Sequence, residues 1–206
     1  MEKKSNHITD ISFKEVKSFK DPFSHILVNE VLAPAVAKQV LDWLKETELW
    51  EIQNATNHNS LAFNIDLSDV PDNLKGIFSG NTFLKLFKTF EDIFKVSLKE
   101  TLVLTAFMYK EGGGTTIHTD FETEKINTFT HRFIIYFNDD WTEKDGGALG
   151  LFRSESVEDL VKIIPPIHNT GVGMLFSPFS HHAVGAVNSG TRYSLVFSLL
   201  SDTKSY

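Results

Sequence analysis

The chain has 206 residues, of which 41% are hydrophobic and 23% charged, and its net charge is −7. This length suits one domain with its own core, and the acidic balance gives no electrostatic footprint for nucleic acid or an anionic membrane. Because the chain has no cysteine, disulfides, thiolate zinc sites, iron–sulfur clusters and cysteine nucleophiles are excluded, and a bound metal must be held by His, Asp or Glu.

The chain carries no run of about 18 apolar residues and no apolar signal-peptide segment. We therefore expect a cytoplasmic protein with no membrane and no nucleic-acid partner. The oligomeric state stays open, since nothing in the composition addresses it.

Two amphipathic helices are predicted in the first half of the chain. Residues 34–49 begin with a proline that suits a first helical turn, and their apolar side chains recur at helical spacing at Val36, Val40, Leu41 and Leu44. Residues 81–96 repeat this spacing with Phe83, Phe87, Phe90 and Phe94. We interpret the phenylalanine stripe as core packing.

From residue 101 the chain changes to short runs of β-branched and aromatic residues, separated by Gly, Asn, Asp and Pro. The expected strands are 101–109, 131–137, 172–177 and 192–200. Helices followed by consecutive strands predict a mainly β (α+β) protein, a helix-supported β-sandwich or jelly roll. We expect a single domain, 1–206, in which 1–100 is mostly helical support with a first strand and 101–200 is the jelly-roll core.

The stretch "GGGTTIHTDF", residues 112–121, holds the first candidate site residues. Side chains alternate in a strand, so His118 and Asp120 would project from the same face at a spacing that suits a metal. Taken alone, such a pair is also common on exposed strands without any function. The glycine run precedes no helix and lacks the Lys-Ser/Thr of a phosphate loop, and we interpret it as a turn after the strand that ends near Tyr109.

A third ligand is expected in "SPFSHHAVGAVNSGTRYSLVF", residues 177–197. If Asn188–Gly190 closes a hairpin, His182 and Arg192 share one face and His181 points the other way. Arg192 would then lie four strand positions from the histidine. That gap would fit a short dicarboxylate that chelates the metal at one end and pairs with the guanidinium at the other.

Two histidines and one carboxylate, His118, Asp120 and His182, form the facial set of ligands found in non-haem Fe(II) oxygenases. In this arrangement the remaining coordination positions stay open to a keto acid and dioxygen, which a closed structural zinc site would not allow.

These motifs together resemble the prolyl-hydroxylase-like group of Fe(II)/2-oxoglutarate-dependent dioxygenases. The likeness rests on "MYKEGGGTTIHTDF", "FIIYFNDDWTEKDGGALGLF" and "HAVGAVNSGTR" and covers about residues 101–200, with a weaker similarity in "DPFSHILVNEVLAPAVAKQVLDWL". The resemblance implies a double-stranded β-helix, His118, Asp120 and His182 as iron ligands, and Arg192 as partner of the distal 2-oxoglutarate carboxylate. It also places Tyr109 and Tyr136 beside the co-substrate.

The implied activity is a hydroxylation coupled to the oxidative decarboxylation of 2-oxoglutarate, with Fe(II) as cofactor and dioxygen as oxidant. Halogenases of this fold lack the carboxylate ligand, so the presence of Asp120 favours hydroxylation. The expected substrate is an unactivated C–H of a small molecule or free amino acid, bound between loops at 53–60 and 121–130. The alternatives are a peptidyl or protein prolyl hydroxylase and, from another class, a catalytically silent jelly-roll binding module.

Overall fold

A computed structural model of the chain describes residues 10–53, 60–122 and 128–201. Most of its strands form one eight-stranded antiparallel sheet, the major sheet. In spatial order this sheet consists of β1 (Glu15–Phe19), β2 (His25–Asn29), β9 (Gly171–Leu175), β6 (His131–Tyr136), β11 (Thr191–Ser201), β5 (Leu98–Lys110), β4 (Ser60–Asn64) and β3 (Glu51–Gln53).

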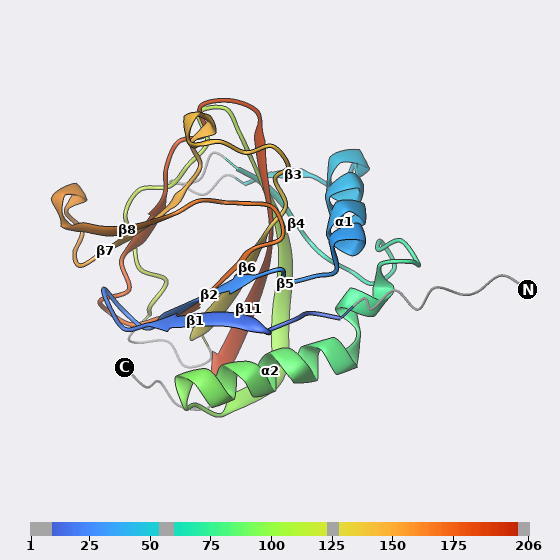
Figure 1. Cartoon of the computed structure of the whole chain (residues 1–206), viewed down its shortest axis with the longest axis horizontal. Helices are drawn as coiled ribbons and strands as arrows, with labels where there is room; N and C mark the ends of the chain where they lie inside the picture. The colour runs from blue at the N-terminus through green and yellow to red at the C-terminus, as the bar shows by residue number, and fades with distance from the viewer. Residues whose placement is uncertain (1–9, 54–59, 123–127, 202–206) are drawn as a thin grey trace, which may run out of the picture.

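A second, smaller antiparallel sheet, the minor sheet, consists of β10 (His182–Val184), β7 (Leu149–Phe152) and β8 (Leu160–Ile164). In Figure 1 the strands β7 and β8 lie on the opposite side of the molecule from helix α1 (Pro34–Glu46). The architecture is a jelly roll, as the sequence predicts.

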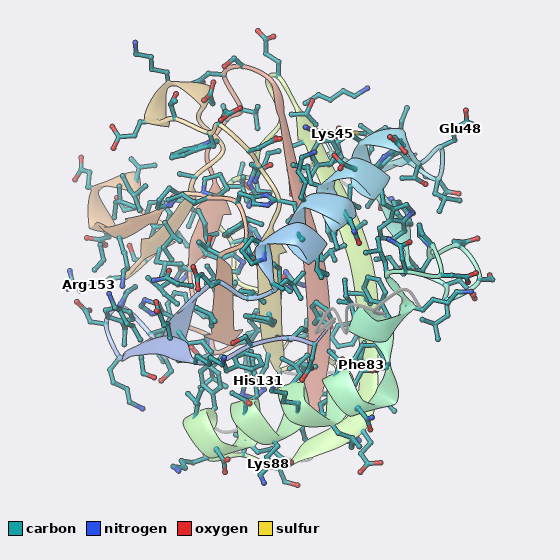
Figure 2. All side chains as sticks on the ribbon, turned by 45° about the vertical axis from the view of Figure 1, so that its right-hand side comes forward. Lys45, Glu48, Phe83, Lys88, His131 and Arg153 are labelled. Atoms are coloured by element: carbon teal, nitrogen blue, oxygen red, sulfur yellow. The ribbon has the colours of Figure 1, made fainter. Side chains whose placement is uncertain are left out.

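Two helices, α1 and α2 (Gly80–Phe94), cover the outer face of the major sheet, and short 3₁₀ helices occur at Lys75–Phe78, Glu143–Asp145 and Val157–Asp159. The expected apolar positions of α1 are buried, and the phenylalanine stripe of α2 packs in the core, with Phe87 and Phe90 buried and Phe83 and Phe94 partly so. Figure 2 shows Phe83 on the sheet side of α2 and Lys88 on the opposite side. Helical periodicity therefore located both helices.

The two faces of the major sheet belong to two separate hydrophobic clusters. On β6, Phe133 and Ile135 point toward the helices, whereas Ile134 and Tyr136 point into the space between the two sheets. This division follows from the alternation of side chains along a strand. Polar side chains on the inner face therefore meet inside the jelly roll.

The first hundred residues contain more strand than the sequence analysis expects. Four strands, β1 to β4, precede residue 65, where a single first strand was expected. They extend the same sheet as β5, β6, β9 and β11, so the boundary drawn near residue 100 falls within one continuous sheet.

The hairpin expected around Asn188–Gly190 is wrong. β10 pairs with β7 in the minor sheet, and β11 pairs with β5 and β6 in the major sheet. The segment between them is held elsewhere, because Gly185 N donates to Ala148 O (2.9 Å) and Val187 N to Gly113 O (2.9 Å). The chain thus crosses from one sheet to the other at this point.

No helix in the described part of the chain has both the length and the apolar character that a membrane span requires. Of the two loops expected at the mouth of the barrel, residues 54–59 and 123–127 lie outside the described residues.

Candidate metal centre

The side chains of His118, Asp120 and His182 converge between the two sheets. The distance from His118 Nε2 to Asp120 Oδ1 is 4.0 Å, and that from His182 Nε2 to Asp120 Oδ2 is 3.2 Å. One ligand atom from each residue lies within 4.8 Å of the other two. Two neighbouring ligands, each about 2.1 Å from one ion, lie about 3 Å apart when they bind at right angles, so the group has the dimensions of a metal site.

Backbone pairing positions the two histidines. His118 lies outside the named strands, in an isolated antiparallel bridge to His182 on β10. This bridge brings the imidazole ring centroids to 4.5 Å. Asp120 follows two residues after His118 and also lies outside the named strands, whereas the sequence analysis expects both residues on one strand.

Both imidazoles are held in the tautomer that a metal requires. His118 Nδ1 lies 2.8 Å from Thr116 O, and His182 Nδ1 lies 2.9 Å from Ser180 O. A carbonyl oxygen only accepts, so each Nδ1 carries the proton and each neutral ring offers the lone pair of Nε2. Both Nε2 atoms face Asp120, and the donor set therefore fits a divalent metal of the imidazole- and carboxylate-binding class.

Asp120 is held in its charged form. Burial opposes the ionisation of this carboxyl, but the positive charge of Arg132 and contacts with His182 and His118 outweigh it, and the pKa of Asp120 lies well below its ordinary value. Arg132 Nη1 donates to Asp120 Oδ2 at 2.6 Å. The carboxylate is thus available as a ligand at neutral pH.

The neighbouring histidine, His181, does not join this group. Its side-chain Nδ1 is buried without a hydrogen-bond partner among the described residues, while its backbone oxygen accepts from Phe152 N at 2.9 Å. The structure therefore places His182, the histidine that the sequence analysis selects, with His118 and Asp120. The hairpin that was used to select it does not form.

Arg192 is buried at the other end of the same space, with 3% of its surface exposed. Its Nε donates to Gly147 O at 2.8 Å, and it has no acidic partner among the described residues. Its guanidinium carbon lies 5.3 Å from the ring centroid of Tyr109, the cross-strand neighbour, and 4.9 Å from that of Tyr136. Since a buried charge without a counterion is costly, this arrangement suits an incoming carboxylate.

Both tyrosines remain neutral donors beside this arginine. Burial raises the pKa of Tyr136, although the positive charge of Arg192 opposes the shift, and burial likewise raises the pKa of Tyr109 against the same charge. The Tyr136 hydroxyl is fully buried and has no well-formed hydrogen bond to any described residue. It is thus a second unsatisfied group beside Arg192.

A cavity of about 240 Å³ connects the metal centre to Arg192. The three candidate ligands, Tyr109 and Arg192 all line it, whereas Tyr136 lies against the guanidinium from the core side. Pockets for drug-sized ligands usually measure 300–1,000 Å³, so this cavity suits a small metabolite.

Sequence reasoning missed a charged residue of the cavity, Arg132 on β6. A signal was present, because Arg132, Ile134 and Tyr136 alternate on one strand and must share a face. A cation on the face that carries Tyr136 should therefore point into the jelly roll. The ion pair with Asp120 could not be foreseen, since it depends on the packing of a loop against this strand.

A jelly roll that holds two histidines, a carboxylate and a buried arginine around one cavity has the features of a metal-dependent oxygenase. Residues 104–199 match the family model described as the 2OG-Fe(II) oxygenase superfamily. A search among curated proteins finds no match.

Solved structures share the fold of this chain. A prolyl-4-hydroxylase from Pseudomonas putida has a TM-score of 0.68 at 16% identity, with 87% of this chain and 93% of that chain covered. A prolyl hydroxylase from Trichoplax adhaerens, in complex with a hypoxia inducible factor peptide fragment, has a TM-score of 0.67 at 14% identity, with 86% and 84% covered. A 2OG-Fe(II) oxygenase family oxidoreductase from Burkholderia pseudomallei has 0.63 at 14% identity, with 85% of each chain covered.

The family match and the fold together confirm the resemblance stated from the motifs. Residues 104–199, just under half of the chain, are thus similar to the 2OG-Fe(II) oxygenase superfamily, and the group of His118, Asp120 and His182 could hold the metal that such an oxygenase requires. The same finding speaks against the alternative of a silent binding module.

Proposed function

We propose that the protein hydroxylates an unactivated C–H bond of a small molecule or free amino acid. His118, Asp120 and His182 hold the iron in this proposal, and Arg192 binds the distal carboxylate of 2-oxoglutarate. The observation that carries it is the buried Arg192, which lacks an acidic partner among the described residues and lies in the same cavity as the three ligands. Only a ligand with a carboxylate at each end would meet both ends of that cavity.

The residues of the chain divide the work of binding and orientation. Thr116 O and Ser180 O fix the two imidazole rings, so that their Nε2 atoms are already directed at one point. Arg132 orients the Asp120 carboxylate, while its positive charge opposes that of a nearby cation, so its two effects on metal affinity largely offset each other.

At the other end, Arg192 presents a guanidinium fork to a carboxylate, and the Tyr136 hydroxyl lies ready to donate a further hydrogen bond. Fe(II), when bound with 2-oxoglutarate and dioxygen, supplies the oxidation that converts C–H to C–OH and releases succinate and carbon dioxide. The apolar walls, which include Phe107, Ile134 and Val196, exclude water from the bound co-substrate.

A peptidyl prolyl hydroxylase is the second candidate. The observation that favours it is the similarity of fold to two prolyl hydroxylases, one of them solved with a peptide fragment. The small volume of the described cavity favours the first candidate, because a peptide needs an open groove along its length.

The test is succinate formation by the purified chain with Fe(II) and 2-oxoglutarate, first without substrate and then with free amino acids and proline-containing peptides. We expect slow succinate formation without substrate, and a small carboxylic acid or an amino acid should stimulate it. His182→Ala should abolish this turnover. Stimulation by peptides alone would favour the second candidate. Absence of both turnover and 2-oxoglutarate binding would contradict the proposal.

A further inference from the structure

Arg132 has more hydrogen-bonding capacity than its ion pair uses. A guanidinium has five N–H donors, and among the described residues only Nη1 has a hydrogen-bond partner, Asp120 Oδ2. Nε is buried and unsatisfied, while about a quarter of the side chain, 24%, remains exposed. Because Arg132 lines the cavity, its remaining terminal donors are available to a ligand there.

The surroundings of Arg132 hold the guanidinium in place. Its carbon lies 5.0 Å from the ring centroid of Phe176, which is itself buried and lies parallel to the His182 ring at 6.4 Å. On β6, Arg132 faces Ser198 of β11 and Met174 of β9, so it stands in the middle of the major sheet. Neither neighbour carries a charge, and the position is rigid on both sides.

The charges of the described cavity do not balance when its proposed ligands are added. Its described lining carries three fixed charges, those of Asp120, Arg132 and Arg192. The two carboxylates of 2-oxoglutarate and Asp120 would together neutralise a divalent iron and Arg192. The positive charge of Arg132 is then left over, because the Asp120 charge with which it pairs is shared with the metal.

We propose that Arg132 binds a carboxylate of the primary substrate, which makes that substrate a small aliphatic carboxylic acid. This inference rests on the proposed function and narrows its substrate class. The walls next to Arg132 are apolar, with Ile134, Val196 and Leu149 among them, and they suit an aliphatic body. The described lining offers no acid besides Asp120, so the site specifies the carboxylate and leaves an amino group optional.

The competing explanation is that Arg132 only positions Asp120. The two roles differ in what removal of the charge disturbs. A positioning residue would act on metal affinity, whereas a substrate-binding residue would act on the preference of the site for an acid over its amide. A peptide-bound residue inside a chain presents amides, so that preference also separates free acids from peptide substrates.

The test uses the full chain loaded with Zn(II), which has no redox chemistry, and 2-oxoglutarate. The probes are three acids, L-proline, L-leucine and 4-methylvalerate, and their primary amides, with occupancy followed by ligand-observed NMR. We expect the wild type to bind at least one acid about 10-fold or more tightly than its amide. Arg132→Gln should remove this preference, Arg132→Lys should keep part of it, and Arg153→Gln, a change at an exposed arginine paired with Asp21, should leave it intact.

Two calorimetric controls separate the failures. Zn(II) and 2-oxoglutarate should bind to Arg132→Gln within about threefold of the wild-type affinities. The inference would be overturned if the wild type bound acids and amides equally, or bound neither. It would also be overturned if Arg132→Gln lost more affinity for the metal or 2-oxoglutarate than for the acid. If the wild type itself bound neither Zn(II) nor 2-oxoglutarate, the proposed function would fail instead.

Discussion

His118 and His182 hydrogen-bond to each other through their backbones, with His118 N 3.0 Å from His182 O and His182 N 2.9 Å from His118 O. Together with the hydrogen bonds between Thr115 and Val184, this bridge joins the segment that carries Asp120 to the minor sheet and sets the relative position of the three candidate ligands. Since the pairing is made by the main chain, a side-chain substitution at either histidine should remove a ligand while leaving the scaffold in place.

Metal binding should therefore distinguish two adjacent histidines. We expect His182→Ala to weaken Mn(II) or Fe(II) binding at least 100-fold, since changes of residues that only support a ligand already cost 10–100-fold. The matched control is His181→Ala, which should bind metal within about threefold of wild type, because the His181 ring is not part of the group. Calorimetry measures both, and loss of metal in His181→Ala with retention in His182→Ala would refute the ligand assignment.

Removal of Arg192 should affect the co-substrate and spare the metal. Loss of a bidentate, charge-assisted partner in a buried pocket costs about 2–5 kcal/mol, so Arg192→Ala should raise the 2-oxoglutarate requirement at least about 30-fold. Arg192→Lys should be intermediate, because it keeps the charge without the fork. Pyruvate, which lacks the distal carboxylate, should be a poor substitute in the wild type and lose little in the variant. Unchanged 2-oxoglutarate affinity in Arg192→Ala would reject the role of this arginine.

The enzyme should hydroxylate its substrate, and not chlorinate it, even when the buffer contains chloride. Asp120 supplies a carboxylate beside the two histidine nitrogens, in the place that a halide ligand would need. Mass spectrometry of the turned-over substrate in chloride buffer should therefore show an added oxygen and no chlorine. A chlorinated product would contradict the place given to Asp120.

Stability should depend on the phenylalanine stripe of α2. Phe90 is fully buried and contacts the rings of Phe133 and Phe94. Phe90→Ala should lower the free energy of unfolding by about 3–5 kcal/mol, because it removes a large side chain and leaves a cavity. Leu84→Ala on the same helix is the control, since Leu84 is 52% exposed and should cost well under 1 kcal/mol. Denaturant unfolding measures both, and equal losses would contradict the orientation of α2.

Stability should also fall as the solution becomes mildly acidic, through His131. Burial lowers the pKa of His131 from 6.5 to about 4, and no described residue satisfies its Nε2. Between these two values the unfolded chain binds a proton that the folded chain does not, so stability contributed by the neutral ring is lost as pH falls from 6.5 toward 4. The slope is up to about 1.4 kcal/mol per pH unit.

Unfolding in denaturant at pH 7.0, 6.0 and 5.0 measures this slope. Other titrating groups contribute equally to the slopes of the wild type and of the variant His131→Gln, so the difference between the two slopes belongs to His131. His131→Gln should have a shallower dependence on pH than the wild type. Identical slopes for the two proteins would show that His131 titrates alike in both states.

The sequence could predict the local features because each depends on a few neighbouring residues. Helical spacing located α1 and α2, the β-branched and aromatic run at 131–137 located β6, and the H-x-D pattern identified His118 and Asp120 as candidate ligands. It could not predict which strands pair. The expected hairpin would pair the segment of His182 with the segment of Arg192, whereas His182 pairs with Leu151 of β7 and Arg192 with Tyr109 of β5.

By itself, the sequence determined the residue types of the candidate site and the short spacing that joins His118 to Asp120, since both are properties of the local chain. The tertiary structure alone decided that His182 and Arg192, which stand in different sheets, face one cavity. It also decided that Arg132 meets Asp120. These relationships arise when two sheets pack face to face, and the energy of such packing belongs to contacts between segments that are distant in the chain.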